Sequence, residues 1–196
     1  VLIAKQMNFT RSDIDDLYRA GMLHDIGKVA IPDSILLKPG KLSELEYKII
    51  QSHVVVSYEI LNNIDIYKDI AEIVRHHHEH FNGLGYPQGL KGNQTPILSQ
   101  IMTLADAFDA MTTNRIYKAR KTVDTALEEL KLLSGKQFNV FVVDAALIVL
   151  KNIYIDENIN QRPNTEIEKE RFAYFYKDQL TKTYNRDYLE FILSYK

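Results

Sequence analysis

The sequence predicts an all-α fold, because signals for helix starts recur along it and strand patterns do not. Ser12 to Asp15 and Ser43 to Glu46 have the spacing of capping boxes, in which both side chains satisfy backbone N–H groups of the first helical turn. Thr95-Pro96 places a cap residue before a proline at the first helical position. Each of these pairs predicts a helix that follows it.

The later helices and the loops follow from the same kind of signal. We expect helices at about 96–112, 123–133 and 140–152. Gly135 is expected to stop the second of these. The stretch 27–42 contains two prolines and two glycines, and 82–93 is rich in glycine, so both are predicted as loops.

Side chains that can bind a metal are concentrated between His24 and Asp106. All six histidines fall between His24 and His80, and carboxylates lie among them. Buried imidazoles and carboxylates are costly without a partner, and a divalent cation suits these ligand types. The candidate metal ligands are His24, Asp25, His53, His77, His78 and Asp106.

The spacing predicts how these side chains point. His77 and His78 continue the apolar helical stripe of Ile70, Ile73 and Val74, so we expect both imidazoles on the inward face of that helix. The carboxylate of the His24-Asp25 pair can bridge two cations, which favours a dinuclear centre. His76 and His80 fall outside the stripe and are interpreted as surface or supporting residues.

Three stretches then show a resemblance. LHDIGKVAIPDSILLKPGKL, HHHEHFNGLGYPQGL and ADAFDAMTTNRIYK resemble the HD-GYP family, a subgroup of HD-superfamily phosphohydrolases that hydrolyse cyclic di-GMP, over residues 1–152. The resemblance implies an HD-superfamily helical bundle with a metal site in its core. It also implies that the six candidate ligands hold two divalent ions, with Asp25 as the bridging ligand.

The resemblance implies further roles around the metal site. Catalytic roles fall to Asp25 and Lys28, and substrate-binding roles to Lys28, Gly85, Tyr86, Asp109, Arg115 and Lys118. Taken alone, Tyr86 is better interpreted as a turn residue whose ring packs over its loop, and the resemblance gives a substrate-facing role equal weight. Lys28, Arg115 and Lys118 likewise fit solvated surface charges.

Two departures from the family pattern stand out. Asn82 stands where the family usually has Asp, and it keeps a turn-forming side chain while losing a charge. No histidine precedes His24, whereas family members carry another metal-binding histidine about one helix upstream. We therefore expect one metal site to lack a ligand and the activity of this chain to be weak. Ligands of nitrogen and oxygen suit iron or manganese, with zinc or nickel as alternatives.

Composition excludes several classes of protein. The absence of cysteine excludes a disulfide scaffold, cysteine-ligated zinc fingers and thiol catalysis. A net charge of −2 with interspersed signs gives no broad basic field for a nucleic-acid polymer. No apolar run reaches transmembrane length, so we expect no membrane segment in this chain. A cytoplasmic location is expected, and an upstream membrane anchor in a longer parent protein is compatible with it.

A composition shift divides the chain. Residues 1–155 form the expected phosphohydrolase domain, 156–164 a polar linker and 165–196 a helical extension. Within the extension, DQLTKTYNRDYLEFIL resembles the opening of a GGDEF domain; an ordinary amphipathic helix pair is the alternative. Apolar faces at both ends, including Leu2, Ile3 and Tyr188, predict a homodimer through terminal helices or a GGDEF-domain partner.

Three functions compete. The first is a metal-dependent phosphodiesterase that hydrolyses cyclic di-GMP to linear pGpG, GMP or both, in bacterial second-messenger signalling. The second is an HD phosphohydrolase of another nucleotide. The third is a cyclic-dinucleotide sensor or partner-binding module without turnover. The GYP motif favours the first, and the intact HD pair, His53 and His77-His78 disfavour the third.

Overall fold

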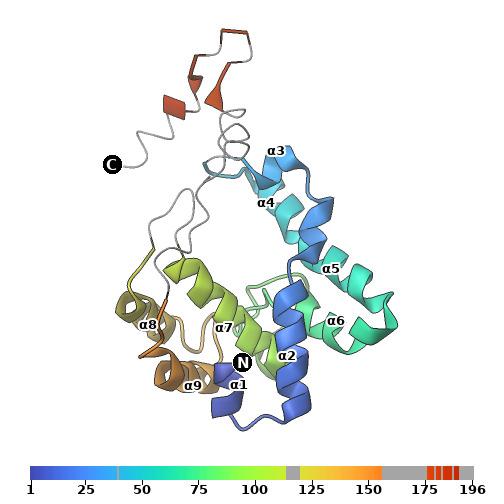
Figure 1. Ribbon diagram of the computed structural model, residues 1–196, viewed down its shortest axis with the longest axis vertical. Coiled ribbons are helices and arrows are strands. Elements are labelled where there is room, and N and C mark those ends of the chain that lie inside the picture. The colour runs from blue at the N-terminus through green and yellow to red at the C-terminus, as the bar shows by residue number, and fades with distance from the viewer. Residues whose placement is uncertain are drawn as a thin grey trace.

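The computed structural model describes residues 1–38, 40–113, 120–155, 176–178, 180–181, 183–186 and 188–189. Within these ranges the chain forms helices and three isolated bridges but no strand, which confirms the predicted all-α fold (Figure 1). The α-helices are α1 (Leu2–Gln6), α2 (Arg11–Leu23), α3 (Asp33–Leu36), α4 (Glu44–Gln51), α5 (His53–Asn62), α6 (Lys68–Arg75), α7 (Ile97–Thr112), α8 (Val123–Leu132) and α9 (Val140–Leu150). Three short 3-10 helices are η1 (Ile26–Ala30), η2 (Asp65–Tyr67) and η3 (Gly92–Gln94).

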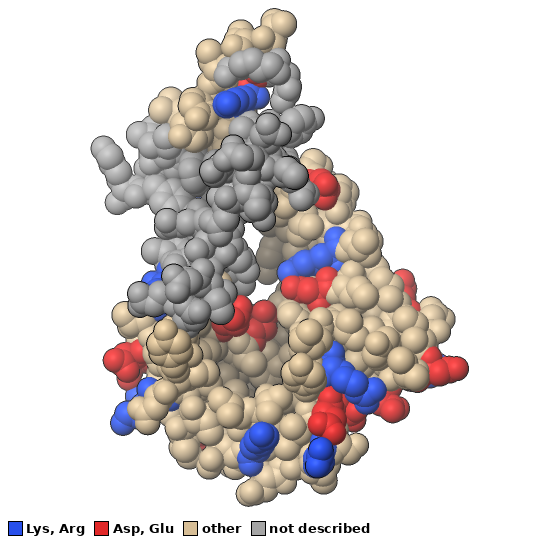
Figure 2. Space-filling model, viewed as in Figure 1, with Lys and Arg blue, Asp and Glu red and all other residues tan. Residues whose placement is uncertain are grey.

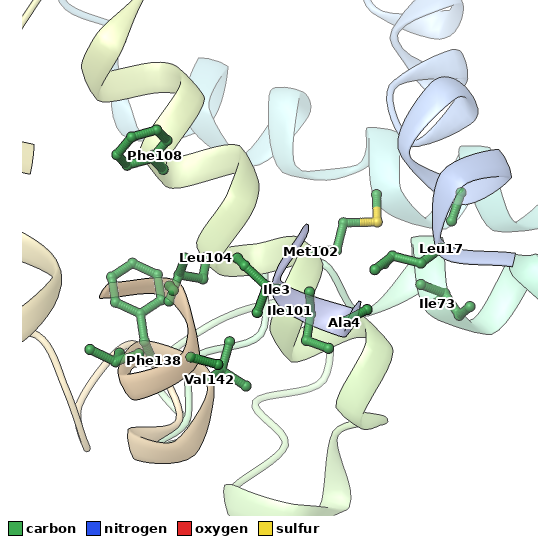
Figure 3. Close-up of a cluster of buried hydrophobic side chains, with 14 of the residues drawn as sticks. Ile3, Ala4, Leu17, Ile73, Ile101, Met102, Leu104, Phe108, Phe138 and Val142 are labelled. Carbon is green, nitrogen blue, oxygen red and sulfur yellow. The ribbon is translucent and has the colours of Figure 1, made fainter. Parts of the chain in front are cut away.

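Helix α7 organises the core. It contacts α1, α2, α6, α8 and α9. Its buried side chains belong to one apolar cluster with side chains of α1, α2, α6 and α9 (Figure 3). The labelled core residues are Ile3, Ala4, Leu17, Ile73, Ile101, Met102, Leu104, Phe108, Phe138 and Val142. A second group of contacts joins α5 to α6 and to η1. This group holds the segment after the HD pair against the helix that begins at His53.

Of the three predicted helix starts, one is found as expected and two are shifted. Ser43 and Glu46 form the predicted capping box. The box expected at Ser12 and Asp15 lies instead at Thr10 and Asp13, because Thr10 offers the same spacing one half-turn earlier and α2 begins at Arg11. Thr95 does not cap α7. Pro96 is the residue before the helix, and its carbonyl accepts the first helical bond, from the Gln100 N–H.

Two other predictions were wrong in part. The segment 27–42 is not all loop, because it contains most of η1 and the whole of α3, and 82–93 runs into η3. Helix α6 ends at Arg75, so His77 and His78 lie in the turn after the helix and not on its face. Apolar periodicity placed both histidines inward correctly but could not show where the helix hydrogen bonds stop. The expected stop at Gly135 agrees with its positive φ of 71° just after α8.

The two ends of the chain behave differently. Ile3 is buried by packing of α1 on α7 and α9, whereas Leu2, the other apolar residue named at this end, stays 48% exposed. The linker 156–164 and most of 165–196 lie outside the described residues. Where the extension is described, Lys177 and Tyr184 form an antiparallel bridge around a turn held by Asp178, in place of continuous helix.

Surface charge agrees with the composition. Figure 2 shows acidic and basic side chains interspersed over the described surface on the face in view. Among the described residues, no helix is both long and apolar enough to cross a bilayer.

Candidate metal centre

Four separate segments bring the predicted ligands together. His24 and Asp25 follow the last turn of α2, His53 opens α5, the His77-His78 pair follows α6, and Asp106 lies within α7. The His77 ring centroid lies 5.2 Å from that of His24, 5.5 Å from that of His53 and 4.1 Å from that of His78. His24 Nε2 lies 3.9 Å from an Asp106 carboxylate oxygen. The expected convergence on one site is therefore present in the structure.

Asp25 lies at the centre of this cluster. Its Oδ2 is 3.3 Å from His24 Nε2 and accepts a hydrogen bond from Lys28 Nζ at 2.6 Å. Its Oδ1 is 3.4 Å from His53 Nε2. Burial alone would raise the pKa of Asp25, but hydrogen bonds from His24 and Lys28 hold that pKa well below its usual range. The side chain is therefore an ionised carboxylate whose two oxygens face different imidazoles.

The backbone fixes which ring nitrogen faces the cluster. In His24, His53 and His77, Nδ1 lies 2.9, 2.7 and 2.5 Å from the carbonyl oxygen three residues earlier. A carbonyl can only accept, so Nδ1 must carry the proton in each of these bonds. In the neutral ring Nε2 then has a free lone pair, which is the arrangement found for metal-ligating histidines; His24 Nε2, which bonds Asp25, must first give up its proton.

Two of these nitrogens are buried without a protein partner. Nε2 of His53 and Nε2 of His77 have no hydrogen-bond partner among the described residues, although the two side chains are 1% and 0% exposed. Buried polar atoms are almost always satisfied, and leaving one unpaired costs about 1–3 kcal/mol. A cation at this point would satisfy both lone pairs.

The pKa shifts favour the ligand form of the imidazoles. Burial, followed by repulsion from neighbouring rings, lowers the pKa of His77 to about 3 and that of His78 to about 2. Burial also lowers the pKa of His53. His24 differs, because the hydrogen bond and charge of Asp25 outweigh burial and raise its pKa. His53, His77 and His78 are thus neutral near pH 7, as metal coordination requires.

The donor atoms form two overlapping sets. One comprises His53, His77 and His78, and the other His24, Asp25 and His77; within each set the donor atoms lie within 4.8 Å of one another. Imidazole nitrogen and carboxylate oxygen in such proximity suit a divalent transition metal. The residues present therefore fit divalent metal binding.

The predicted substrate residues are divided by the structure. Lys28 and Tyr86 lie at the cluster, the first through Asp25 and the second with its ring centroid 4.8 Å from that of His78. Gly85 lies against the backbone of His80, because a Cβ added at Gly85 would lie 2.2 Å from the His80 backbone nitrogen. Asp109 is exposed and accepts a hydrogen bond from the Thr113 hydroxyl, so the structure does not join it to the cluster. Arg115 and Lys118 lie outside the described residues.

His76 and His80 differ from each other. His76 is 5% exposed, so the surface interpretation is wrong for it; one ring nitrogen lies 3.1 Å from Glu72 Oε2. His80 is half-buried, and its carbonyl accepts a hydrogen bond from Gly83 N–H.

Sequence reasoning missed two buried polar residues that support the site. Ser57, one turn after His53 on α5, accepts from Gly27 N–H at 2.8 Å and donates to the His24 carbonyl at 2.9 Å. The contact is close, because a Cβ on Gly27 would lie 2.2 Å from the His53 carbonyl oxygen. A polar residue on the buried side of α5 was the only available signal.

Glu79 is the second missed residue. Its side chain is buried, and its carboxylate accepts hydrogen bonds from the backbone N–H groups of Gln88, Gly89 and Leu90 at 2.7–3.1 Å. The signal in the sequence was a carboxylate directly after the paired histidines, which is indistinguishable there from a surface charge.

Known proteins resemble this chain. It is 42% identical over 153 residues to a cyclic di-GMP phosphodiesterase of Thermotoga maritima, covering 77% of this chain and 42% of that protein. It is 40% identical over 126 residues to 3′3′-cGAMP-specific phosphodiesterase 3 of Vibrio cholerae, covering 64% of this chain and 27% of the relative. The chain thus spans less than half the length of these curated relatives.

The fold comparison and the family comparison agree. A crystal structure of a cyclic GMP-AMP specific phosphodiesterase of Vibrio cholerae superposes with a TM-score of 0.59 over 89% of this chain and 51% of that one. Because the two sequences are 18% identical, this structural likeness is evidence for the fold alone. The family model described as HD domain matches residues 2–140, which include every candidate metal ligand. The chain therefore belongs to the HD domain family.

Proposed function

We propose that this chain is the catalytic domain of a metal-dependent phosphodiesterase of the HD-GYP group that hydrolyses cyclic di-GMP. The observation that carries the proposal is the pair of buried, unpartnered Nε2 atoms of His53 and His77 facing an ionised Asp25. Relatives 35–42% identical bear the name cyclic di-GMP phosphodiesterase, which supports the substrate class. The domain would comprise residues 1–155.

We further propose two divalent ions, with Asp25 between them. Each Asp25 oxygen faces a different imidazole, which suits a bridging carboxylate, and the overlapping donor sets supply one group of ligands for each ion. Asp106 would complete the set from α7. Iron or manganese is favoured for these nitrogen and oxygen ligands. Bound ions of this kind supply a water of lowered pKa and neutralise charge on the phosphate.

The protein's own residues would orient the substrate. Lys28 Nζ reaches the edge of the cluster through Asp25 and is placed to meet a phosphate oxygen as a point charge. The Tyr86 ring lies over His78 and offers an apolar face beside the phosphate position. Arg115 and Lys118 are proposed as further phosphate contacts, three residues apart after α7. Asp109 is the weakest member of the proposed set, because its carboxylate is engaged by Thr113.

The remaining assignments belong to this proposal. Residues 156–164 would be a linker, and 165–196 the beginning of a GGDEF-like domain that acts as a partner of the phosphodiesterase. Terminal helices would mediate a homodimer. The reaction would take place in the cytoplasm, where a bacterial second messenger of this class acts.

A second substrate has specific support. Relatives 36–42% identical bear the name 3′3′-cGAMP-specific phosphodiesterase, so the hybrid dinucleotide is the alternative. The two substrates differ in one base, and the metal centre acts on a phosphate that both share. Discrimination must therefore come from residues that contact the bases.

The test is a hydrolysis assay with both dinucleotides. The protein is loaded in turn with Mn²⁺, Fe²⁺, Zn²⁺ and Ni²⁺, and products are separated by chromatography. We expect linear pGpG or GMP from cyclic di-GMP, a lower kcat/KM for 3′3′-cGAMP, and no product after chelation. His77→Gln serves as the inactive control. Binding of cyclic di-GMP without turnover under every metal would favour the sensor function and overturn the proposal.

A further inference from the structure

The loop that carries Tyr86 is tied down by a single buried charge. Glu79 Oε1 accepts from the N–H groups of Gln88 and Gly89 at 2.7 and 3.1 Å, and Oε2 accepts from the N–H of Leu90 at 3.0 Å. Both oxygens are used, and the side chain is fully covered. Charge-assisted bonds of this kind are about twice as strong as neutral ones. Consecutive backbone N–H groups around one anion form a nest, so the carboxylate acts as the template of the loop.

The other end of the same loop is pressed against the metal centre. Tyr86 N–H donates to the His78 carbonyl at 3.1 Å, and the Tyr86 ring lies 4.8 Å from the His78 ring at an interplanar angle of 30°. Gly85 leaves no room for a side chain, because a Cβ would lie 2.4 Å from the His78 carbonyl oxygen. The loop is therefore fixed between a candidate metal ligand and Glu79, the residue that directly follows it.

This arrangement separates two tasks that neighbouring residues perform. His77 and His78 direct ring nitrogens to the metal centre, whereas Glu79 directs both carboxylate oxygens away from it, into the loop. Glu79 contributes to neither donor set of the centre. Its removal should leave the cation site intact and release the loop.

We propose that Glu79 is a positioning residue for substrate binding, which holds Gln88–Leu90 so that Tyr86 stays against His78 at the wall of the metal centre. The proposal rests on the proposed phosphodiesterase function for the identity of the ligand. A carboxylate is required, because an amide offers an acceptor on one side only. Its NH₂ group would oppose either Leu90 N–H or the pair from Gln88 and Gly89.

The decisive variant is Glu79→Gln, with Glu72→Gln as the matched control. Glu72 lies on the other side of His76 and is 53% exposed, so its substitution removes a carboxylate without touching the loop. In the metal-loaded protein, we expect Glu79→Gln to keep its metal content and to show faster hydrogen exchange at the amides of 88–90. We expect KM for cyclic di-GMP to rise about tenfold, which corresponds to 1.4 kcal/mol, with kcat changed less than about threefold.

A double substitution tests the route of the effect. If Glu79 acts through Tyr86, Tyr86→Ala combined with Glu79→Gln should have the KM of Tyr86→Ala alone. Additive increases in KM would overturn the proposal. Faster amide exchange with unchanged KM would also overturn it, because Glu79 would then be structural only. Loss of metal from Glu79→Gln would assign the residue to the cation site instead.

Two further measurements cover a variant that does not fold and a wild type that does not hydrolyse cyclic di-GMP. If Glu79→Gln does not fold, Glu79→Asp keeps the charge, shortens its reach by one methylene and is measured in the same way. A wild type that binds but does not hydrolyse cyclic di-GMP refutes the proposed function, and the dissociation constant then replaces KM as the measure of Glu79. A wild type that neither binds nor hydrolyses it refutes both.

Discussion

The metal centre and the glycine-rich loop bury polar side chains side by side, yet they satisfy them differently. In the centre, Nε2 of His53 and of His77 has no partner among the described residues. In the loop, the Glu79 carboxylate has three backbone donors. Because an unpaired buried polar atom is costly, the first pattern indicates a site for a ligand and the second a structural support. The difference distinguishes two roles that residue type alone does not separate.

The largest expected effect comes from removing the shared carboxylate of the centre. Asp25→Asn keeps the shape of the side chain but loses the charge that faces His24, His53 and Lys28. We expect metal content to fall sharply and hydrolysis to fall more than about 100-fold. Asp144→Asn, at an exposed position on α9, is the control. Unchanged metal stoichiometry, measured by elemental analysis, would contradict the bridging role.

Metal should stabilise the centre and leave the loop unchanged. A cation that binds the folded state at about 100 times its Kd adds about 2.7 kcal/mol, which for a chain of this size raises Tm by roughly 5–10 °C. His77→Gln should abolish this increase, whereas Glu79→Gln should keep it. Thermal unfolding with and without Mn²⁺ measures the effect. An equal rise in Tm for His77→Gln would place the cation elsewhere.

The metal-free protein should lose stability as the pH falls. The folded pKa values of His77 and His78, about 3 and about 2, lie below the ordinary 6.5, so the unfolded state binds more protons throughout that window. Stability then rises with pH up to about 6.5 and is lost towards acid. The raised pKa of His24 acts in the opposite sense, because its contribution is present at low pH and lost as pH rises.

His77 and His78 together outweigh His24, so the net result is expected to be a loss of about 3 kcal/mol between pH 7 and pH 5. Urea unfolding in the presence of a chelator measures it, and His77→Gln should flatten the dependence. If the two proteins show the same slope, the imidazole of His77 is not the group that resists protonation.

A smaller effect is expected where a neutral group supports the centre. Ser57→Ala removes both hydrogen bonds that hold the His24–Gly27 turn on α5, and should cost about 1–2 kcal/mol of unfolding free energy and weaken metal binding. Ser52→Ala is matched to it, since the Ser52 hydroxyl donates to the Ile49 carbonyl at the end of α4. Equal stability and equal metal affinity in the two variants would show that the Ser57 bonds position nothing.

The sequence predicted the residues that converge on the candidate centre better than the residues that support them. His24, Asp25, His53 and the His77-His78 pair stand out because their residue types are unusual in a core and recur at intervals that helices can bring together. The hydrogen-bond partners of Ser57 and Glu79 are backbone groups up to 33 positions away. Apart from proline, every residue type offers the same backbone groups, so the sequence does not indicate these partners. The backbone carbonyls that orient three imidazoles were hidden for the same reason.

The helices, like the site, were predicted only where a local pattern in the sequence marks them. The recurring helix signals gave the right class, the helix after the Ser43 capping box and the three described α-helices after residue 95. The turn at 76–78 and the short helices within 26–36 were missed, because they depend on tertiary contacts: the turn bonds the glycine-rich loop, η1 packs on α5 and α3 packs on α4. Local pattern alone could not distinguish the end of α6 from its continuation.

The smallest effect is expected at Asn82, in the loop. Asn82 stands where the HD-GYP pattern that the chain resembles usually has Asp, and its Oδ1 accepts from the Leu84 N–H at 3.0 Å, which closes a turn through the oxygen alone. Asp supplies the same oxygen, so Asn82→Asp should change KM and kcat less than about twofold and stability by less than about 0.5 kcal/mol. Asn82→Ala, which lacks the acceptor, should cost about 1 kcal/mol and raise KM by loosening the segment before Tyr86. If Asn82→Asp instead shifts KM as strongly as Asn82→Ala does, the charge and not the turn is what this position controls, and the loop takes part in the electrostatics of the metal centre.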